Sequence, residues 1–584
     1  MRVIATAGHV DHGKSTLVRA LTGTDPDRWA EEHQRGLTID LGFVWTTLPS
    51  GEDVAFVDVP GHQRFIANTL AGIGPVPAVM LIVSADEGWR RQTQEHFEAI
   101  RALGVRHLLV AVTRSDLTDP EPVIADVRKR LAANGFDDVD IIPVSAITGS
   151  RLDELRVGLD RLIDALPEPD VHGRVRMWID RVFSIRGAGT VVTGTLGSGT
   201  LRVGDAVSVA GRAVSVRRIQ SLEQPRDQVA AVARVAVNLR GIETTDVERG
   251  DLLLGAGEWH RTHVVDVRLG GAAPEDLPGE LMAHVGTTAF QVRVRPLGGD
   301  AVRLQWHCDL PLLVGDRLVL RDPGRQQVLG GAVVLDLDPP AFTRRGAARR
   351  RAEELADHSA TVDAVREVAR RGYMRAAELQ ALGGEPSDAV RQVGEWLVDP
   401  GQWSAWITEL ESAVDSYAAA HPLRPQVPTG VVADAISLPA TELVRPLASE
   451  AGLVVEAGEV SRPGMSADLG GAEAGIAEIE RRLADAPFAA PDRADLSALD
   501  LGPKQLAAAV RLGRLIDLGD QILLSPGAPA LAMRALAALR QPFTTSQARQ
   551  ALGTTRRVVI PLLEHLDAKG WTRRIDAGHR EVVR

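Results

Sequence analysis

The chain has little cysteine and no long apolar segment. Cys308 is the single cysteine among 584 residues, which excludes internal disulfides and cysteine-based metal clusters. No apolar run approaches the ~18 residues needed to span a bilayer. The first residues favour a strand rather than the basic and apolar regions of a signal peptide. We therefore expect a cytoplasmic protein with no membrane partner.

The chain also lacks an overall excess of positive charge. Its formal net charge is −11, which by itself argues against a nucleic-acid partner, because phosphate binding needs local positive charge. The distribution of charge is uneven, however. Residues 541–584 carry eight basic and four acidic groups, whereas residues 411–470 carry three basic and eight acidic groups. This asymmetry indicates a partner for the C-terminal segment.

A glycine-rich stretch near the N-terminus matches a phosphate-binding pattern. Residues 8–15 read GHVDHGKS and fit G-x-x-x-x-G-K-[ST]. Residues 2–7 predict a buried strand and residues 15–21 a helix, so that the helix N-terminus would aim unpaired backbone N–H groups at an anion. Lys14 would then supply charge to the β and γ oxygens of a nucleotide, and Ser15 would offer a hydroxyl to Mg²⁺.

Two stretches downstream predict the moving parts of a nucleotide-hydrolysing switch. They are residues 35–40 (RGLTID) and 58–62 (DVPGH). Thr38 is a candidate for the second protein hydroxyl on Mg²⁺, and Asp58 is expected to contact the ion through water. The amide of Gly61 would face the γ-phosphate, so that loss of this phosphate releases both segments.

His62 stands where Ras-like switches carry the glutamine that orients the attacking water. We predict that His62 is the catalytic side chain. Val10 and Leu37 are predicted to form an apolar gate that keeps the imidazole away from the water until a partner moves it. The alternative is a histidine with a purely structural role.

Base selection is predicted from two loops that follow strands. The strand ending at Val112 leads into residues 113–116 (TRSD), where guanine-binding proteins usually carry Asn-Lys-x-Asp. Asp116 can accept the N1 and N2 hydrogens of guanine, Arg114 could lie on the base, and residues 145–147 (SAI) would give the guanine oxygen a backbone N–H. We therefore expect GTP and GDP rather than ATP. The candidate nucleotide-binding residues are Gly8, His9, Val10, Asp11, His12, Gly13, Lys14, Ser15, Thr16, Asp58, Gly61, Thr113, Arg114, Asp116, Ser145, Ala146 and Ile147.

The pattern of apolar residues divides the chain into domains. Residues 1–170 alternate short apolar strands with helical patterns, which predicts a doubly wound α/β domain. Residues 174–256 and 257–340 consist of short β-branched strands separated by glycine turns, which predicts two β-barrels.

The remaining part of the chain contains a repeated acidic-x-Gly turn. The repeats stand at residues 399–401, 456–458, 517–519 and 576–578. Helical patterns followed by a β-hairpin about every 60 residues predict four tandem winged-helix modules, a variant of the helix-turn-helix. The expected modules are residues 345–410, 411–468, 471–527 and 529–584. The predicted fold class is therefore multidomain: an α/β P-loop GTPase domain, two β-barrels and four winged-helix (α+β) modules.

These motifs together resemble a known family. The chain is similar to the translational GTPases of the elongation factor Tu type at residues 7–14 (AGHVDHGK), 35–40, 58–62 and 92–96 (QTQEH). Within that class it resembles the selenocysteine-specific elongation factors at residues 36–42 (GLTIDLG) and 179–195 (IDRVFSIRGAGTVVTGT). The resemblance covers essentially the whole chain. The predicted winged-helix modules best distinguish this chain from elongation factor Tu, because elongation factor Tu ends after its barrels.

The resemblance implies delivery of selenocysteyl-tRNA to a ribosome paused at an in-frame UGA codon that an mRNA hairpin (SECIS) marks. The family's selenocysteine pocket, in the first barrel, matches Asp180, Arg181 and Arg234. Two guanidinium groups suit a selenol, which is ionised near neutral pH where the hydroxyl of serine is not. Arg114 departs from the family, which usually carries lysine at that position.

The resemblance also implies an RNA site in the last winged helix, which in the family grips the mRNA hairpin. It maps onto the start of a predicted recognition helix and onto the wing, at Arg556, Arg557, Arg573 and Arg574. The ribosome, rather than an arginine of the enzyme, would trigger hydrolysis, and we expect the chain to be a monomer.

Two alternatives remain open. One is a generalist tRNA or initiation GTPase, against which Arg181, Arg234 and the basic last module argue. The other is a nucleic-acid-binding regulator whose GTPase serves only as a timer. The acidic residues 411–470 argue against that alternative, because a row of DNA-binding winged helices should be basic throughout.

Overall fold

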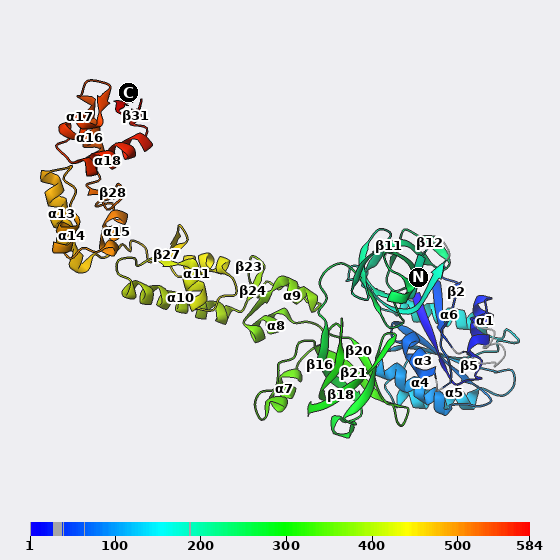
Figure 1. The fold of residues 1–584 in the computed structure, drawn as a ribbon. Coiled ribbons are helices and arrows are strands. Elements are labelled where there is room, and N and C mark those ends of the chain that lie inside the picture. Colours follow the sequence, from blue (N-terminus) through cyan, green and yellow to red (C-terminus); the bar gives the residue numbers. More distant parts are fainter. Residues whose placement is uncertain (1, 27–37, 39, 63–64, 186–188, 584) are drawn as a thin grey trace. The chain divides into compact units, whose positions relative to one another are not determined.

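The chain forms two compact units in the computed structural model, which describes residues 2–26, 38, 40–62, 65–185 and 189–583. The first unit comprises residues 1–367 and 375–387, and the second comprises residues 368–374 and 388–584. Both contain helices and strands (Figure 1). Among the described residues, no helix is long and apolar enough to cross a membrane.

The first unit begins with a six-stranded sheet in the order β2-β3-β1-β4-β5-β6. Neighbouring strands are parallel except for β2 and β3. The strands are β1 (Arg2–Gly8), β2 (Gly42–Thr47), β3 (Asp53–Asp58), β4 (Ala78–Ser84), β5 (His107–Thr113) and β6 (Ile141–Pro143). The helices are α1 (Lys14–Thr22), α3 (Ile66–Ile73), α4 (Arg91–Ala102), α5 (Glu121–Ala132) and α6 (Leu152–Asp164).

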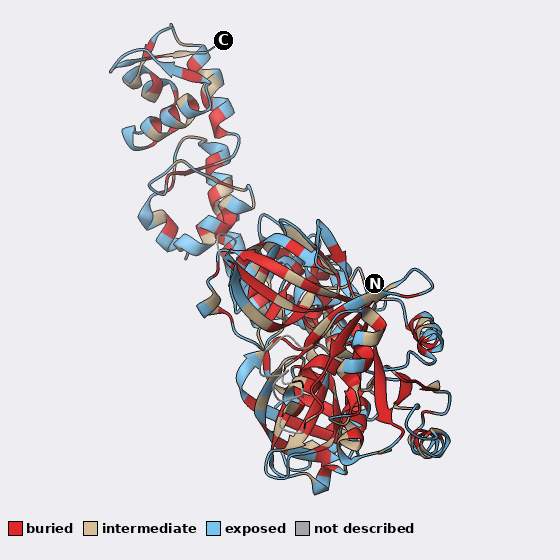
Figure 2. Ribbon diagram, turned by 90° about the vertical axis from the view of Figure 1, so that its right-hand side faces the viewer, coloured by how far each residue is buried: buried red, intermediate tan, exposed pale blue. Residues whose placement is uncertain are grey.

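Helices cover both faces of this sheet, whose strands are largely buried (Figure 2). α1 and α6 pack against Ile4, Phe56 and Ile82 on one face. α3, α4 and α5 pack against Val57 and Leu81 on the other. Alternate side chains of a strand thus enter opposite cores. Because the parallel strands end at one edge of the sheet, the loops after β1, β3, β5 and β6 gather there, which is where such sheets bind ligands.

Two β-barrels follow, as predicted. In the first, the order β10-β15-β7-β8-β14-β11 closes through pairing of β10 with β11, and the second is the closed barrel β16-β19-β18-β17-β20-β21. The strands of the first are β7 (Arg176–Ile185), β8 (Gly189–Ser198), β9 (Thr200–Arg202), β10 (Ala206–Val209), β11 (Arg212–Ser221), β12 (Gln224–Arg226), β13 (Gln228–Ala230), β14 (Ala233–Arg240) and β15 (Leu252–Leu254). Those of the second are β16 (Thr262–Gly271), β17 (Glu280–Val285), β18 (Thr288–Gly298), β19 (Ala301–Leu310), β20 (Arg317–Asp322) and β21 (Gln327–Asp336).

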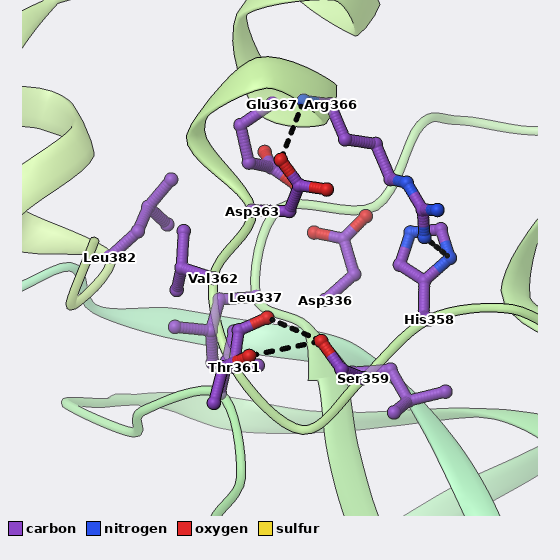
Figure 3. Close-up of a pocket in the computed structure, with 12 residues that line it drawn as sticks. Asp336, Leu337, His358, Ser359, Thr361, Val362, Asp363, Arg366, Glu367 and Leu382 are labelled. Atoms are coloured by element: carbon purple, nitrogen blue, oxygen red, sulfur yellow. Dashed lines mark hydrogen bonds between the residues drawn. The ribbon is translucent and has the colours of Figure 1, made fainter. Parts of the chain in front are cut away.

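The helix expected to open the first winged-helix module belongs instead to the second barrel. α7 (Ala347–Leu355) packs on β18 and β19, where Leu355 enters a small core with Leu297. Arg268 donates to three main-chain carbonyls at and beyond the end of α7. The turn that follows lines a small pocket together with the end of β21 (Figure 3). The module boundary predicted at residue 345 is therefore wrong.

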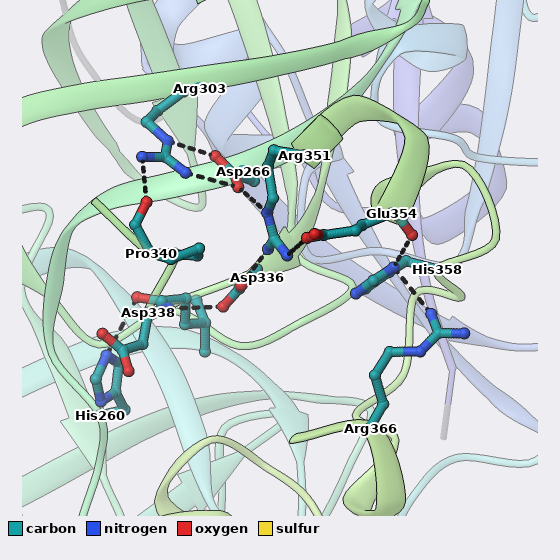
Figure 4. Close-up of polar contacts among 11 residues, drawn as sticks. His260, Asp266, Arg303, Asp336, Asp338, Pro340, Arg351, Glu354, His358 and Arg366 are labelled. Atoms are coloured by element: carbon teal, nitrogen blue, oxygen red, sulfur yellow. Dashed lines mark hydrogen bonds and ion pairs between the residues drawn. The ribbon is translucent and has the colours of Figure 1, made fainter. Parts of the chain in front are cut away.

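Arg351 of α7 is the centre of a buried ion network (Figure 4). Its Nε lies 2.8 Å from Oδ2 of Asp266, and its guanidinium also pairs with Asp336. Arg303 binds both oxygens of Asp266 at 2.7 and 3.0 Å, and all four side chains are at most 5% exposed. Burial lowers the pKa of Arg351, but the hydrogen bond to Asp266 and the charges of Asp336 and Asp266 outweigh it and raise that pKa.

Replacing Arg351 with alanine is expected to destabilise the second barrel strongly, because two buried carboxylates lose a partner. Removing one side of a buried ion pair costs about 3–5 kcal/mol. The exposed pair of Arg349 with Glu353 on the same helix is worth about 0.5 kcal/mol. Calorimetric unfolding of Arg351→Ala and of the control Arg349→Ala measures the difference. Equal effects of the two changes would contradict this account.

The second unit contains three complete winged-helix modules, each with three helices and a β-hairpin. The helices are α10 (Pro400–Ala420), α11 (Thr429–Ala435) and α12 (Val444–Glu450); α13 (Glu473–Asp485), α14 (Arg493–Ala498) and α15 (Pro503–Arg511); and α16 (Ala528–Ala537), α17 (Thr545–Ala551) and α18 (Arg556–Ala568). The strands are β25 (Val427–Pro428), β26 (Val454–Glu456) and β27 (Glu459–Ser461); β28 (Ile516–Asp517) and β29 (Leu523–Leu524); and β30 (Phe543–Thr544), β31 (Thr572–Arg574) and β32 (His579–Val582).

The segment before α10 is not a complete module. It contains α8 (Ala364–Arg371), β22 (Tyr373–Arg375), α9 (Ala376–Ala381), β23 (Arg391–Val393) and β24 (Trp396–Val398). All residues between α9 and β23 are described, and none is helical, so the third helix is missing. The division between the two units also falls within this segment. The prediction of C-terminal winged helices is confirmed, but the count of four is not.

The first acidic-x-Gly repeat differs from the other three. The last three repeats lie at the turns of β-hairpins. By contrast, Asp399 caps α10, where its carboxylate accepts from the backbone N–H groups of Gly401 and Gln402 at 2.9 and 3.1 Å. Aspartate favours both turns and helix N-termini, which is why the sequence pattern is shared. The predicted boundary between residues 410 and 411 falls inside α10 and is therefore wrong.

Candidate functional site

The phosphate-binding pattern folds as the loop between β1 and α1. Gly8 and Gly13 have φ values of 142° and 79°, which glycine adopts without steric cost. A Cβ atom on Gly8 would lie 2.2 Å from the carbonyl oxygen of Ile82. Lys14 is buried, and its Nζ donates to the carbonyl of His9 at 2.8 Å. The structure thus places the predicted residues 8–16 at a helix N-terminus, where an anion is favoured.

Three oxygen-bearing side chains meet beside this loop. Oγ of Ser15 lies 3.0 Å from Oγ1 of Thr38 and donates to Oδ2 of Asp58 at 2.8 Å. Asp58 is fully buried, and its other oxygen accepts from the hydroxyl of Thr6. Hydroxyl and carboxylate oxygens are ligands that Mg²⁺ prefers, so this donor set fits that ion.

The chain after β3 passes close over the phosphate loop. A Cβ atom on Gly61 would lie 2.7 Å from the backbone nitrogen of Val10 and 2.4 Å from Nζ of Lys14, so this position has no room for a side chain. His62, the next residue, is partly exposed, as is Val10. Leu37, the other predicted member of the apolar gate, lies outside the described residues.

The end of β5 is tied to the phosphate loop. The hydroxyl of Thr113 donates to the carbonyl of His12 at 2.7 Å. The guanidinium of Arg114 pairs with Asp86 at 2.8 Å and donates to the carbonyl of Asp11. The sequence did not point to Asp86, because its contact with Arg114 joins the ends of two neighbouring strands.

The other base-selecting candidates lie on the loops after β5 and β6. Asp116 is exposed, and Ile147 is 81% exposed. Ser145 is buried, and its Oγ accepts from the backbone N–H of Thr148 at 3.1 Å. Ala146, between Ser145 and Ile147, is partly buried. The buried Ser145 thus holds this turn in shape, and the exposed Ile147 leaves its tip open to solvent. A nucleotide base can bind at such a tip.

Two side chains of α4 bind the phosphate loop, and neither was assigned a role from the sequence. The backbone N–H of Val10 donates to Oε1 of Gln92, and that of Gly8 donates to Nδ1 of His96, both at 3.0 Å. Burial, followed by the like charges of Lys14 and His9, lowers the pKa of His96 to about 3. Both residues belong to the motif QTQEH at residues 92–96, and this motif is the sequence signal by which they could have been found.

The neutral state of His96 predicts sensitivity to acid. The ordinary pKa of histidine is near 6.5, so between pH 6.5 and 3 the unfolded chain binds a proton here that the folded chain does not. The contribution of His96 to the free energy of unfolding is therefore fully present above pH 6.5 and falls on acidification, by about 2 kcal/mol at pH 5. Pulse proteolysis in urea at pH 7 and pH 5 measures this loss. His96→Gln should reduce it, whereas His172→Gln, at an exposed position, should leave it unchanged.

The candidate selenocysteine-pocket residues lie where the first barrel meets β2. Asp180 is buried, accepts from the hydroxyl of Thr193 at 2.7 Å and pairs with both terminal nitrogens of Arg234. The guanidinium carbons of Arg234 and Arg181 lie 3.6 and 5.1 Å from the ring centroid of Phe43. A cavity opens beside them. The structure thus brings all three predicted residues together and adds Phe43 from the α/β domain.

The arginines predicted to bind RNA are exposed on the last winged helix. They are Arg556, Arg557, Arg573 and Arg574. The first two begin α18, as predicted, and Arg573 pairs with Glu581 across the wing. Arg580 is buried and pairs with Asp567 at 2.8 Å, so part of the basic charge of this segment is structural.

Comparison with known families matches four parts of the chain. Residues 1–168 match the elongation factor Tu GTP binding domain and residues 189–254 elongation factor Tu domain 2. Residues 267–341 match the beta-barrel domain of selenocysteine-specific elongation factor, and residues 534–580 match the winged helix of elongation factor SelB.

Individual relatives agree. The selenocysteine-specific elongation factor of Escherichia coli is 35% identical over 427 residues, which cover 70% of this chain and 67% of that protein. The chain belongs to the family of selenocysteine-specific elongation factors. The Desulfomicrobium baculatum member is also 35% identical, over 57% of this chain and 55% of that protein. The crystal structure of bacterial selenocysteine-specific elongation factor EF-Sec matches with a TM-score of 0.80 at 25% identity and covers 100% of both chains.

Membership in the family fixes the class of reaction. The N-terminal domain is that of a translational GTPase of the elongation factor Tu type, which binds GTP and GDP. The family predicted from the sequence is thereby confirmed.

Proposed function

We propose that this protein delivers selenocysteyl-tRNA to the ribosome at UGA codons marked by an mRNA hairpin and hydrolyses GTP when the ribosome triggers it. The observation that carries the proposal is the placement of Arg181 and Arg234 around Phe43. Two guanidinium groups at one site favour an anion, so they would select the ionised selenol over the neutral hydroxyl of serine on the same tRNA.

In the nucleotide site, residues 8–15 would hold the phosphates of GTP. Ser15 and Thr38 would hold Mg²⁺, with Asp58 acting through water; the ion, when bound, neutralises charge on the phosphate oxygens. Asp116 would accept hydrogens from guanine, together with the loop at residues 145–147. Asp86 holds the guanidinium of Arg114, so the aliphatic part of the Arg114 side chain would pack against the base.

In hydrolysis, His62 would orient the attacking water. Gly61 would present its amide to the γ-phosphate, and Val10 and Leu37 would keep the imidazole away until the ribosome moves it. Because the ribosome triggers the reaction, GTP would be hydrolysed only after correct decoding.

The last winged helix would bind the mRNA hairpin. Arg556 and Arg557 at the start of α18, with Arg573 and Arg574 at the wing, would contact its phosphates and fix its orientation. We propose that the protein acts in this way as a monomer in the cytoplasm.

The proposal is tested by equilibrium binding with a non-hydrolysable GTP analogue. The same tRNA charged with selenocysteine is expected to bind about ten-fold or more tightly than when charged with serine, because hydrogen bonds to a charged group contribute about 1.5–3 kcal/mol each. Arg181→Ala should remove most of this preference. The control Arg212→Ala, an exposed position in the same barrel, should keep it. Equal binding of the two charged tRNAs would refute the proposal.

A further inference from the structure

Asp40 connects the α/β domain to the candidate selenocysteine pocket. Its carboxylate lies 3.2 Å from the guanidinium of Arg181 and 3.7 Å from that of Arg249. The carbonyl of the next residue, Leu41, accepts a hydrogen bond from Arg181. The side chains of Asp40 and Arg181 are 27% and 25% exposed. This partial shielding strengthens their attraction relative to a pair at the open surface.

Each guanidinium of the pocket therefore has its own carboxylate. Arg234 pairs with Asp180, which belongs to the same barrel. Arg181 pairs with Asp40, which belongs to the α/β domain. The first pair can persist whatever the α/β domain does, whereas the second depends on where that domain places Asp40.

The position of Asp40 is in turn tied to the nucleotide site. Thr38, two residues earlier, is buried, and its Oγ1 lies 3.0 Å from Oγ of Ser15. Two residues of chain span at most about 7 Å. A displacement of Thr38 from Ser15 that exceeds the reach of this short tether therefore moves Asp40 and disturbs its contact with Arg181.

We propose that Asp40 is a positioning residue that couples the nucleotide state to the grip on the aminoacyl group. The inference rests on the proposed roles of Thr38 and Arg181. While Thr38 stays beside Ser15, Asp40 and the carbonyl of Leu41 hold Arg181 next to the ring of Phe43. When loss of the γ-phosphate releases Thr38, Arg181 loses both partners and the aminoacyl group is released. By linkage, the charged tRNA favours GTP over GDP by the same factor.

The test measures a coupling factor with the full chain: the Kd of selenocysteyl-tRNA with GDP divided by its Kd with a non-hydrolysable GTP analogue. Asp40→Asn and Asp40→Ala are expected to lower this factor about ten-fold or more, mainly by weakening the complex with the analogue. Asp40→Glu keeps the charge and should restore most of the coupling. The control Asp53→Asn, on β3 where Asp53 accepts from Thr47, should match the wild type.

The reciprocal measurement separates positioning from damage to the pocket. The measured quantity is the ratio of the Kd for GDP to the Kd for the GTP analogue, with and without selenocysteyl-tRNA. In the Asp40→Asn chain, the increase in this ratio that the tRNA causes should fall by the same factor as the coupling. Asp180→Asn should weaken tRNA binding equally in both nucleotide states and leave the factor unchanged. Wild-type coupling in both Asp40→Asn and Asp40→Ala would overturn the inference. A wild-type chain that does not distinguish selenocysteyl-tRNA from seryl-tRNA would overturn the proposed function instead.

Discussion

Replacing His62 with alanine is expected to lower ribosome-stimulated GTP hydrolysis by about 10²–10⁴-fold, the usual contribution of a positioned acid–base side chain. His62 follows Gly61, whose main chain passes over the phosphate loop with no room for a side chain. We expect the ribosome to move the imidazole from this position beside the phosphate loop toward the attacking water. GTP binding depends on residues 8–16 and on the base loops, so it should persist.

Rapid mixing with programmed ribosomes measures the single-turnover rate of GTP hydrolysis by the His62→Ala variant and by the wild type. The control is Phe65→Leu, because the ring of Phe65 lies 6.1 Å from that of His62, centroid to centroid. This change keeps an apolar side chain beside an intact imidazole, so its rate should stay near that of the wild type. A His62→Ala rate close to the wild-type rate would show that another group orients the water.

Replacing Arg556 and Arg557 together with alanine is expected to weaken binding of the mRNA hairpin by about 10²–10⁴-fold, from about 1–3 kcal/mol for each lost contact. Both side chains are exposed at the start of α18, so we expect their removal to leave the fold intact. If they contact phosphates, the slope of log K against log salt should fall by about 0.7–0.9 for each.

Filter binding of the hairpin over a range of salt concentrations measures both quantities. The control pair Arg128→Ala and Lys129→Ala, on α5 of the α/β domain, removes the same charge outside the winged-helix modules and should leave hairpin affinity unchanged. GTP hydrolysis should be the same in both double variants. Unchanged RNA affinity in the Arg556/Arg557 variant would show that the hairpin binds elsewhere.

The nucleotide site could be predicted from the sequence because its motifs are local and ordered. The phosphate loop, Asp58 and Gly61 lie on loops at one edge of a parallel sheet, where such motifs meet by topology. Contacts between distant segments could not be predicted in this way. Gln92 and His96 reach the phosphate loop from a helix more than 80 residues away, and no local pattern specifies that meeting.

The second barrel and the winged helices show why charge and turn patterns are ambiguous. The sequence predicts that the helical segment of α7 opens the first winged-helix module, yet Arg351 is buried because Asp266 and Asp336 approach it from strands of the barrel. The motif at Asp399 reads as a hairpin turn, yet the proline that follows and the long apolar helix make it an N-cap. Tertiary contacts thus decided the role of Arg351, whereas the residues directly after Asp399 decided its role.

The proposed function is tested most directly by reconstituted translation of an mRNA with an in-frame UGA codon. Reactions contain this protein, GTP and one tRNA charged with either selenocysteine or serine, on messages with and without the hairpin. Efficient full-length product is expected only with selenocysteyl-tRNA and the hairpin together. Equal read-through with seryl-tRNA, or without the hairpin, would contradict the proposed function.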